Sequence, residues 1–248
     1  MKQNIYDDPE FFNGYKTMRD NKGGLNEPLE QPAMISLLPD VKGMDVLDLG
    51  CGAGDLCRII KQLGAKSVIG VDISSKMIEL AKKDVPAGVE FIVSPIEDYD
   101  PKSRKFDLIF SSLALQYIEN LENVYAQVNS YLKPNGIFLF SVEHPIISCA
   151  HGEPGWYKDE KGKKLHWRVD SYEEEGKRSM HWIVDNVVKY HKKFSTIINL
   201  LIKTGFTILE VQEPVASKEE EKKRPDLAEE RRRPPFLIVK ALKTVSGI

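Results

Sequence analysis

Short apolar runs alternate with amphipathic segments along most of this chain. The runs indicate buried strands over residues 46–49, 67–72, 89–93, 106–110, 136–142, 207–211 and 236–239. Between them, apolar residues recur at helical spacing over residues 56–63, 77–81, 121–132 and 198–202. Strands that alternate with helices predict an α/β fold, in which a mostly parallel sheet carries helices on both faces.

The first predicted strand ends in the most informative segment of the chain, the glycine-rich run 50–54. Glycines are needed there because the backbone must turn sharply and let a ligand approach without a Cβ in the way. A helix begins directly behind this run and stops at Gly64. Strand, glycine turn and helix together predict a nucleotide site at the carboxyl edge of the sheet.

The spacing of the glycines indicates which nucleotide binds. A dinucleotide site would carry Gly-x-Gly-x-x-Gly to cradle a pyrophosphate, but here the third glycine, Gly54, comes one residue early. Asp48 places a negative charge beside the turn, which disfavours a pyrophosphate and favours a ligand with an ammonium group. The pattern Asp-x-Gly-x-Gly-x-Gly resembles the first motif of the class I S-adenosylmethionine-dependent methyltransferases, in their small-molecule, type 11-like branch.

This resemblance implies a Rossmann-like sheet of seven strands, the last of them inserted antiparallel. It also implies that S-adenosylmethionine is the cofactor and that the glycine turn binds it. The acid of the motif would hold the amino-acid end of the cofactor. The residues that the resemblance places in this part of the site are Asp48, Gly50, Cys51, Gly52 and Gly54.

A second acidic residue, Asp72, ends the strand over 67–71. A carboxylate at the end of the second strand can accept hydrogen bonds from both hydroxyls of a ribose. The resemblance assigns this role to Asp72 and places Ile73, with Met77 on the next helix, beside the adenosine. The same branch often carries an aspartate where this chain has Pro95, which supplies neither a carboxylate nor an N–H.

Adenine recognition is therefore expected from the backbone of Ile96 and from Glu97. The segment after the fourth strand resembles the part of the family that lies beside the methionine portion and the reacting methyl. It implies cofactor contacts from Ser111, Ser112, Leu113 and Tyr117. Methyltransferases that act on exocyclic base amines usually carry Asn/Asp-Pro-Pro-aromatic here. The sequence Ser-Ser-Leu-Ala argues against such an activity, although not against every RNA substrate.

Residues 1–39 precede the common fold and are predicted to form a helical cap. Aromatic and apolar residues recur at helical spacing between 11 and 18, and a second helix is expected over 27–38. The simple interpretation is a helix that covers the sheet edge. Relatives with a Tyr-x-x-Met-Arg segment suggest a sharper hypothesis, in which Tyr15 and Arg19 also close over the cofactor, with the arginine near its carboxylate.

Residues 145–193 form the second region outside the common fold, and they contain all three tryptophans. An insertion at this place in the family usually builds a lid over the acceptor pocket. Aromatic side chains suit this role because they supply rigid apolar walls and can face a cationic sulfonium. We predict an antiparallel ribbon that begins at Trp167 and runs through 183–188, with Asp185 and Asn186 as its turn.

Two histidines are candidate general bases for the acceptor. His144 follows the strand whose end faces the pocket, and His191 belongs to a Tyr-His pair that recurs in this branch and could line the acceptor site. A structural or solvated role is more common for histidines of a lid, and Glu143-His144-Pro145 could simply form a hydrogen-bonded corner. The spacing of the histidines does not match paired zinc ligands, so no metal site is predicted.

Composition limits the remaining alternatives. The chain has 248 residues, a net charge of −2 and 42% hydrophobic residues, which fits one α/β domain with a sizeable core. This charge gives no reason to expect attraction to nucleic acids or anionic membranes. No apolar run approaches the roughly 20 residues that cross a bilayer, and the N-terminus lacks a signal-peptide pattern. The three cysteines suggest no disulfide framework, so a cytoplasmic location is expected.

The leading functional hypothesis is a methyltransferase that moves a methyl group to an O, N or C centre of a small metabolite by in-line displacement. An RNA or protein methyltransferase is the alternative among enzymes. A protein that binds S-adenosylmethionine without catalysis is the alternative from another class. A nicotinamide dehydrogenase is disfavoured by the glycine spacing. The sequence indicates neither the acceptor nor the oligomeric state.

Overall fold

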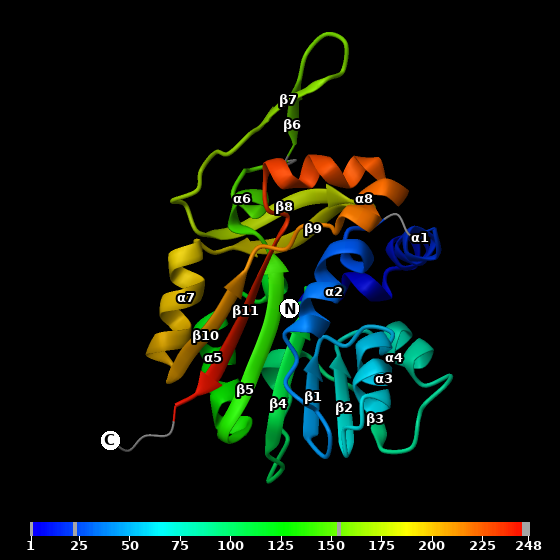
Figure 1. Ribbon diagram of the computed structural model, residues 1–248, viewed down its shortest axis with the longest axis vertical. Coiled ribbons are helices and arrows are strands. Elements are labelled where there is room, and N and C mark those ends of the chain that lie inside the picture. The colour runs from blue at the N-terminus through cyan, green and yellow to red at the C-terminus, as the bar shows by residue number, and fades with distance from the viewer. Residues whose placement is uncertain (1, 22–23, 153–154, 245–248) are drawn as a thin grey trace.

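Seven strands form the central sheet of the computed structural model, in the order β10-β11-β5-β4-β1-β2-β3 (Figure 1). The structure describes residues 2–21, 24–152 and 155–244. The strands of this sheet are β1 (Asp45–Leu49), β2 (Ser67–Asp72), β3 (Val89–Val93), β4 (Phe106–Ser112), β5 (Leu132–Glu143), β10 (Phe206–Gln212) and β11 (Phe236–Lys243). Strands β1 to β5 pair in parallel, whereas β11 runs antiparallel between β5 and β10. The predicted seven-stranded, mostly parallel sheet is confirmed.

Helices cover both faces of this sheet because side chains alternate along each buried strand. On β1, Val46 packs on one face and Leu47 on the other; on β4, Leu108 and Ile109 divide in the same way. The helices that pack on the first face are α2 (Gln31–Ser36), α3 (Asp55–Gln62) and α4 (Ser75–Ala81). Those that pack on the second are α5 (Leu121–Tyr131) and α7 (Phe194–Lys203).

Two boundaries differ from the sequence pattern. The helix expected over 27–38 begins as a π-helical turn, Asn26–Glu30, and continues as α2. The turn residues 133–136 lie inside β5, where they form an irregularity in the pairing with β4. Asn135 has a positive φ of 61° there. Tertiary pairing with β4 therefore carries the strand through a local turn signal.

The N-terminal cap crosses the carboxyl edge of the sheet. Its elements are the 3-10 turn η1 (Ile5–Asp7) and helix α1 (Pro9–Asp20). Asp8 caps α1, since its carboxylate accepts from the backbone N–H groups of Glu10 and Phe11. Phe11 is fully buried and its ring lies 5.2 Å from that of Trp182. The cap and the inserted segment are therefore packed against each other.

The inserted segment lies above the same edge (Figure 1). It contains α6 (Pro145–Ser148) and two ribbons, β6–β7 (Trp156–Lys158 with Lys164–Trp167) and β8–β9 (Gly176–Trp182 with Val184–His191). Helix α8 (Lys218–Lys223) and the 3-10 segment η5 (Pro225–Arg232) follow β10 and lie beside it.

The predicted ribbon turn at Asp185 and Asn186 is wrong, although β9 and its antiparallel partner are present. Trp182 pairs with Val184, so the chain reverses at Ile183, which has a φ of 68°. Ile183 packs on α1 so closely that its Cγ2 would lie 2.5 Å from a Cβ added at Gly14. A tertiary contact therefore places the turn where local turn preferences do not. Trp167, predicted to begin the same ribbon, belongs to the separate ribbon β6–β7.

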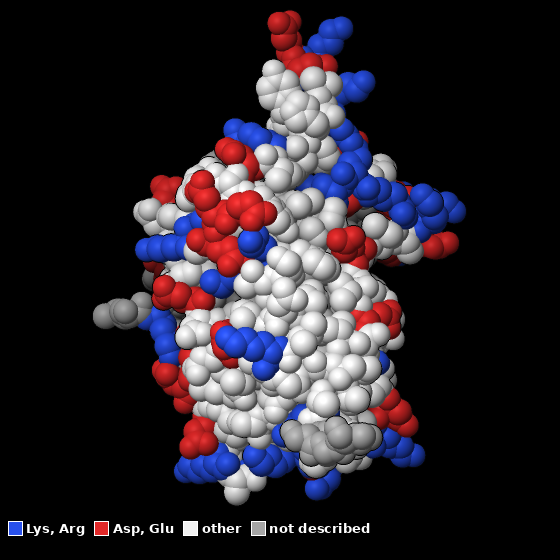
Figure 2. All heavy atoms as spheres, turned by 90° about the vertical axis from the view of Figure 1, so that its left-hand side faces the viewer, with Lys and Arg blue, Asp and Glu red and all other residues white. Residues whose placement is uncertain are grey.

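Charged side chains of both signs intermingle over the face shown in Figure 2, which looks onto the side of α7 and β10. Leu209 and Val211 on β10 and Ile202 on α7 are exposed there among them. Among the helices that the structure describes, none combines the length and the apolar character that crossing a membrane requires.

Candidate active site

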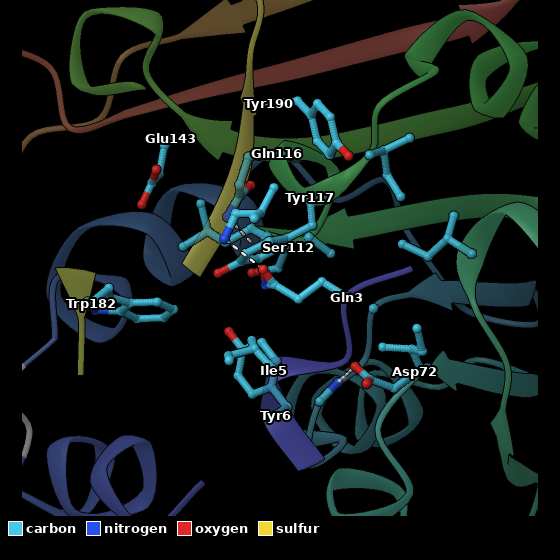
Figure 3. A pocket seen from close by; sticks show the side chains of 18 of the residues that line it. Gln3, Ile5, Tyr6, Asp72, Ser112, Gln116, Tyr117, Glu143, Trp182 and Tyr190 are labelled. Carbon is cyan, nitrogen blue, oxygen red and sulfur yellow. Dashed lines mark hydrogen bonds between the residues drawn. The ribbon is translucent and has the colours of Figure 1, made fainter. Parts of the chain in front are cut away.

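A cavity of about 770 Å³ lies at the carboxyl edge of the sheet, between the N-terminal cap and the inserted segment (Figure 3). The parallel strands β1, β2 and β4 end at this edge, which is where ligands bind in open α/β sheets. Residues 50 and 52 of the glycine turn, the end of β2 and the segment after β4 line one half. Trp182, Val188 and Tyr190 of the β8–β9 ribbon line the other half, with Glu143 at the end of β5.

Most residues expected at the cofactor site meet in this cavity, although they come from distant parts of the chain. Those that line it are Tyr15, Gly50, Gly52, Asp72, Ile73, Met77, Ile96, Glu97, Ser112, Leu113 and Tyr117. Five other expected residues, Arg19, Asp48, Cys51, Gly54 and Ser111, are not among the lining residues. Their structural surroundings show what they do instead.

Three of these five residues shape the turn from behind. Gly54 has a φ of 82°, and a Cβ there would lie 2.4 Å from the ring of Phe91. Cys51 is buried, and its Sγ would meet a Cβ placed at Gly70. Ser111 is also buried, and its hydroxyl donates to the carbonyl oxygen of Leu49 at 2.6 Å. These contacts support the glycine turn from the side away from the cavity.

Asp72 is held by backbone donors at the edge of the cavity. Its carboxylate accepts from the N–H of Gly52 at 2.9 Å and from the N–H of Ser74 at 2.8 Å. Burial raises its pKa, while these two bonds oppose that effect. A Cβ at Gly52 would meet nothing within 4 Å, so the space in front of this turn is open. Both features fit a ribose-bearing ligand that approaches the backbone closely.

Two buried carboxyl groups lie behind the glycine turn. Asp48 accepts from the thiol of Cys57 at 3.2 Å through Oδ2, while no described residue donates to its Oδ1. Glu30 is fully buried, and its Oε2 likewise has no donor among the described residues. Burial raises the pKa of both groups, that of Asp48 to about 8. Unpaired carboxyl oxygens are costly to bury, and they fit a ligand that brings a positive charge.

The sequence analysis missed Glu30. Its Oε1 accepts from the hydroxyl of Ser112 at 2.7 Å and from that of Ser141. It therefore joins the N-terminal cap to the ends of β4 and β5. A signal was present, because Glu30 shares the apolar face of the predicted helix with Met34 and Leu37. An acid at such a position needs a partner in the interior.

The cap is fastened on both sides of the cavity. Asp7 accepts from the hydroxyls of Ser74 and Ser75 and from the N–H of Lys76. These bonds lower the pKa of Asp7 to about 2, although burial opposes them. Gln3 accepts from the N–H of Val188 on β9 at 2.6 Å. Figure 3 shows the segment of Gln3 between Asp72 and Trp182, so the cap spans both halves of the cavity.

Residues 40–199 match the family described as methyltransferase domain. The chain belongs to the S-adenosylmethionine-dependent methyltransferases. An uncharacterized protein of Haemophilus influenzae is 38% identical over 250 residues, which is 98% of each chain. The crystal structure of an S-adenosylmethionine-dependent methyltransferase from Mesorhizobium loti is 39% identical and covers 86% of this chain and 97% of that one, with a TM-score of 0.80. The crystal structure of a putative S-adenosylmethionine-dependent methyltransferase from Listeria monocytogenes is 38% identical. It covers 87% of this chain and 97% of that one, with a TM-score of 0.81.

In this methyltransferase, a buried ion pair lies at the half of the cavity beneath the insertion. Glu143 Oε1 accepts from Lys189 Nζ at 2.6 Å, and the lysine side chain is only 4% exposed. The ammonium also lies 4.8 Å from the centroid of Trp182 and 5.9 Å from that of Tyr117. Figure 3 shows Glu143 and Trp182 on the same side of the cavity. Neither Glu143 nor Lys189 had been predicted, because each acquires its role from the other.

The two histidines proposed as bases do not line this cavity. His144 caps α6, accepting from the N–H of Ile146, and its Nε2 lies 2.9 Å from Glu213 Oε1. His191 is fully buried, with Nδ1 on Ser148 and Nε2 on the carbonyl oxygen of Tyr172. Burial lowers the pKa of both imidazoles. Both ring nitrogens of each residue are engaged by other groups of the methyltransferase.

Metal ligation has no visible basis in the methyltransferase. Within the ranges described, no three His, Cys, Asp or Glu side chains are grouped as a metal site.

Proposed function

We propose that this methyltransferase moves a methyl group to an O, N or C centre of a small metabolite that carries an apolar or aromatic part. The observation that supports this acceptor class is the apolar and aromatic part of the cavity wall, which includes Trp182, Tyr190, Ile147 and Phe236. The whole cavity of about 770 Å³ lies within the range of small-ligand sites, roughly 300–1,000 Å³.

The cofactor would lie between the glycine turn and the N-terminal cap. Asp72 accepts the ribose hydroxyls, and the adenine lies among Ile73, Met77 and Ile96. The backbone of Ile96 and the Glu97 side chain read the edge of the base. This assignment rests on their places along the cavity wall.

The amino-acid end of the cofactor would lie near the buried acids. Burial raises the pKa of Asp48 and Glu30, and an ammonium group bound in front of the turn would favour their ionised forms. Arg19 lies 3.7 Å from Asp55 at the start of α3, and its charge acts on both Tyr15 and Glu30. It is therefore placed to approach the cofactor carboxylate while Tyr15 closes over the cavity.

S-adenosylmethionine supplies an electrophilic methyl whose sulfur leaves as a neutral thioether. The protein contributes alignment of the acceptor and exclusion of water. Alignment of two bound reactants is worth about 7–11 kcal/mol of the barrier. The cap would contribute to alignment and to the exclusion of water, because it is hydrogen-bonded to the start of α4 through Asp7 and to β9 through Gln3 and so covers both reactants.

A macromolecular nucleic-acid acceptor is disfavoured. The net charge is −2, and the face in Figure 2 shows basic and acidic side chains interspersed, without a field of one sign. The segment Ser111 to Ala114 also lacks the pattern of base-amine methyltransferases.

The first test is calorimetric titration with S-adenosylmethionine, S-adenosylhomocysteine and NAD. Micromolar binding of the two sulfur ligands without NAD binding is expected. Metabolite pools below about 1 kDa would then be screened for the release of S-adenosylhomocysteine. Turnover with these pools supports the proposal, whereas turnover with RNA or protein alone would replace the acceptor class. Cofactor binding without turnover of any pool would favour a non-catalytic binding protein.

A further inference from the structure

The acceptor half of the cavity carries polar atoms without partners, and these define what its ligand must offer. Glu143 Oε2 is inaccessible to solvent and receives no hydrogen bond from the described residues. Gln116 Oε1 on the same cavity is in the same state, while its amide nitrogen donates to the carbonyl oxygen of Leu113. Both are acceptor atoms that would gain from a donor on the ligand.

Lys189 forms an ion pair with Glu143 from the side facing away from the cavity. Lys189 does not line the cavity, whereas Glu143 does, so the ammonium takes Oε1 and leaves Oε2 to a ligand. A carboxylate forms stronger hydrogen bonds than a neutral acceptor does. The unpartnered oxygen is therefore a strong acceptor for an N–H or O–H.

Arg233 places a positive charge and hydrogen-bond donors at the same end of the cavity. Its side chain is 10% exposed, and its guanidinium carbon lies 4.2 Å from the ring centroid of Trp167. Nη1 lies 2.8 Å from Glu230 Oε2, but neither atom is aligned for a hydrogen bond, and Nε has no acceptor among the described residues. The free Nε–H of a guanidinium stacked on an aromatic ring matches a carboxylate on a ligand.

We propose that the acceptor is a carboxylic acid that also bears the methyl-receiving O–H or N–H, with Arg233 holding the carboxylate and Glu143 Oε2 holding the donor. This inference rests on the proposed function. The acceptor oxygen or nitrogen forms a bond to the methyl carbon while the carbon–sulfur bond breaks and its electron pair returns to sulfur. The acceptor proton passes to Glu143 Oε2 and leaves to water with the product. Glu143 can be a weak base, since a methylated onium centre is strongly acidic.

The test uses ring-sized probes that differ in one group, because the acceptor itself is unidentified. The three isomeric hydroxybenzoates, benzoate, hydroxybenzyl alcohols and tyramine would be titrated by ligand-observed NMR against the full chain saturated with S-adenosylhomocysteine. At least one hydroxybenzoate should bind about tenfold more tightly than its alcohol and than tyramine. Equal binding of acids and alcohols, preference for the amine, or no binding of any acid would overturn the proposal.

Two substitutions separate the two roles. Arg233→Gln should abolish the preference for acid over alcohol, while Arg232→Gln, a change of the adjacent arginine outside the cavity wall, should keep it. Glu143→Gln should bring the ratio of hydroxybenzoate to benzoate affinity toward one. Glu143→Asp, which keeps the charge, serves where the first variant does not fold. An unchanged ratio in the variants that fold overturns the role of Glu143.

Binding of S-adenosylhomocysteine is measured in every variant. If it fails in the unmodified protein, the proposed function fails. If it succeeds while the acid preference is absent, only this inference fails.

Discussion

Glu30 and Ser112 are joined by a hydrogen bond of 2.7 Å, although they lie 82 positions apart in the chain. The bond places an acid from the N-terminal cap at the end of β4, where its second oxygen lacks a donor among the described residues. We therefore predict that the cap contributes to the cofactor site and does not only cover the sheet edge.

The first prediction concerns this acid. Glu30→Gln should keep the free energy of unfolding near that of the unmodified protein, because burial already favours the neutral carboxyl. It should weaken S-adenosylhomocysteine binding about tenfold, since a glutamine cannot ionise when the ammonium group of the ligand approaches. Binding of 5′-methylthioadenosine, which lacks the amino-acid end, is the control and should not change in calorimetry. An equal loss of affinity for both ligands would show that Glu30 does not act on the ammonium group.

Asp48 should make the stability of the ligand-free protein depend on pH. Its folded pKa of about 8 lies above the ordinary value near 3.9, so the folded state retains a proton that the unfolded state has lost. Stability should therefore fall between these values as pH rises, by up to about 1.4 kcal/mol per pH unit from this group. In urea unfolding from pH 5 to 8, the free energy of unfolding of Asp48→Asn should rise steadily relative to that of the unmodified protein. The exposed Asp40→Asn should show no such trend.

Asp72→Ala should lower the affinity for S-adenosylhomocysteine by at least about 100-fold. The change removes the acceptor for two ribose hydroxyls, and hydrogen bonds to charged groups contribute about 1.5–3 kcal/mol each. Asp72→Asn, which retains one acceptor oxygen, should lose less. Isothermal calorimetry provides the measurement, and normal affinity in the alanine variant would refute the ribose assignment.

Arg19→Ala should weaken S-adenosylhomocysteine about fivefold, in line with a partly exposed ion pair worth up to about 1 kcal/mol. Its effect on 5′-methylthioadenosine should be negligible, because that ligand has no carboxylate. The exposed Lys16→Ala on the same helix is the matched control. Unchanged affinity for both ligands would leave Arg19 as a structural partner of Asp55 only.

Asp7→Asn should loosen the cap by about 1 kcal/mol at pH 7, because it weakens the bonds to Ser74, Ser75 and Lys76. The folded pKa of about 2 lies below the ordinary value, so this stabilisation is complete above pH 4. It is lost as pH falls toward 2, where the two proteins should unfold alike. Denaturant unfolding at both pH values checks the window, with Glu10→Gln as the exposed control. A difference that persists at pH 2 would contradict it.

The sequence by itself determined the fold class and the cofactor, and most residues that it assigned to the cofactor line one cavity. The alternation of apolar runs fixes strands and helices locally, and the spacing from Asp48 to Gly54 specifies a turn that one stretch of chain builds alone. Asp72 could be placed for the same reason, because it follows directly from the end of a strand. Local patterns are sufficient wherever one segment provides the geometry.

The tertiary structure alone decided the acceptor half. Glu30, Glu143 and Arg233 acquire their roles from partners in other segments, and no periodicity reports such pairs. His144 looked reactive in the sequence, but the fold uses both of its ring nitrogens for caps and ion pairs. The ribbon turn moved to Ile183 because packing on α1 outweighs turn preference. Burial and long-range pairing set the chemistry of a side chain, and both exist only once the chain has folded.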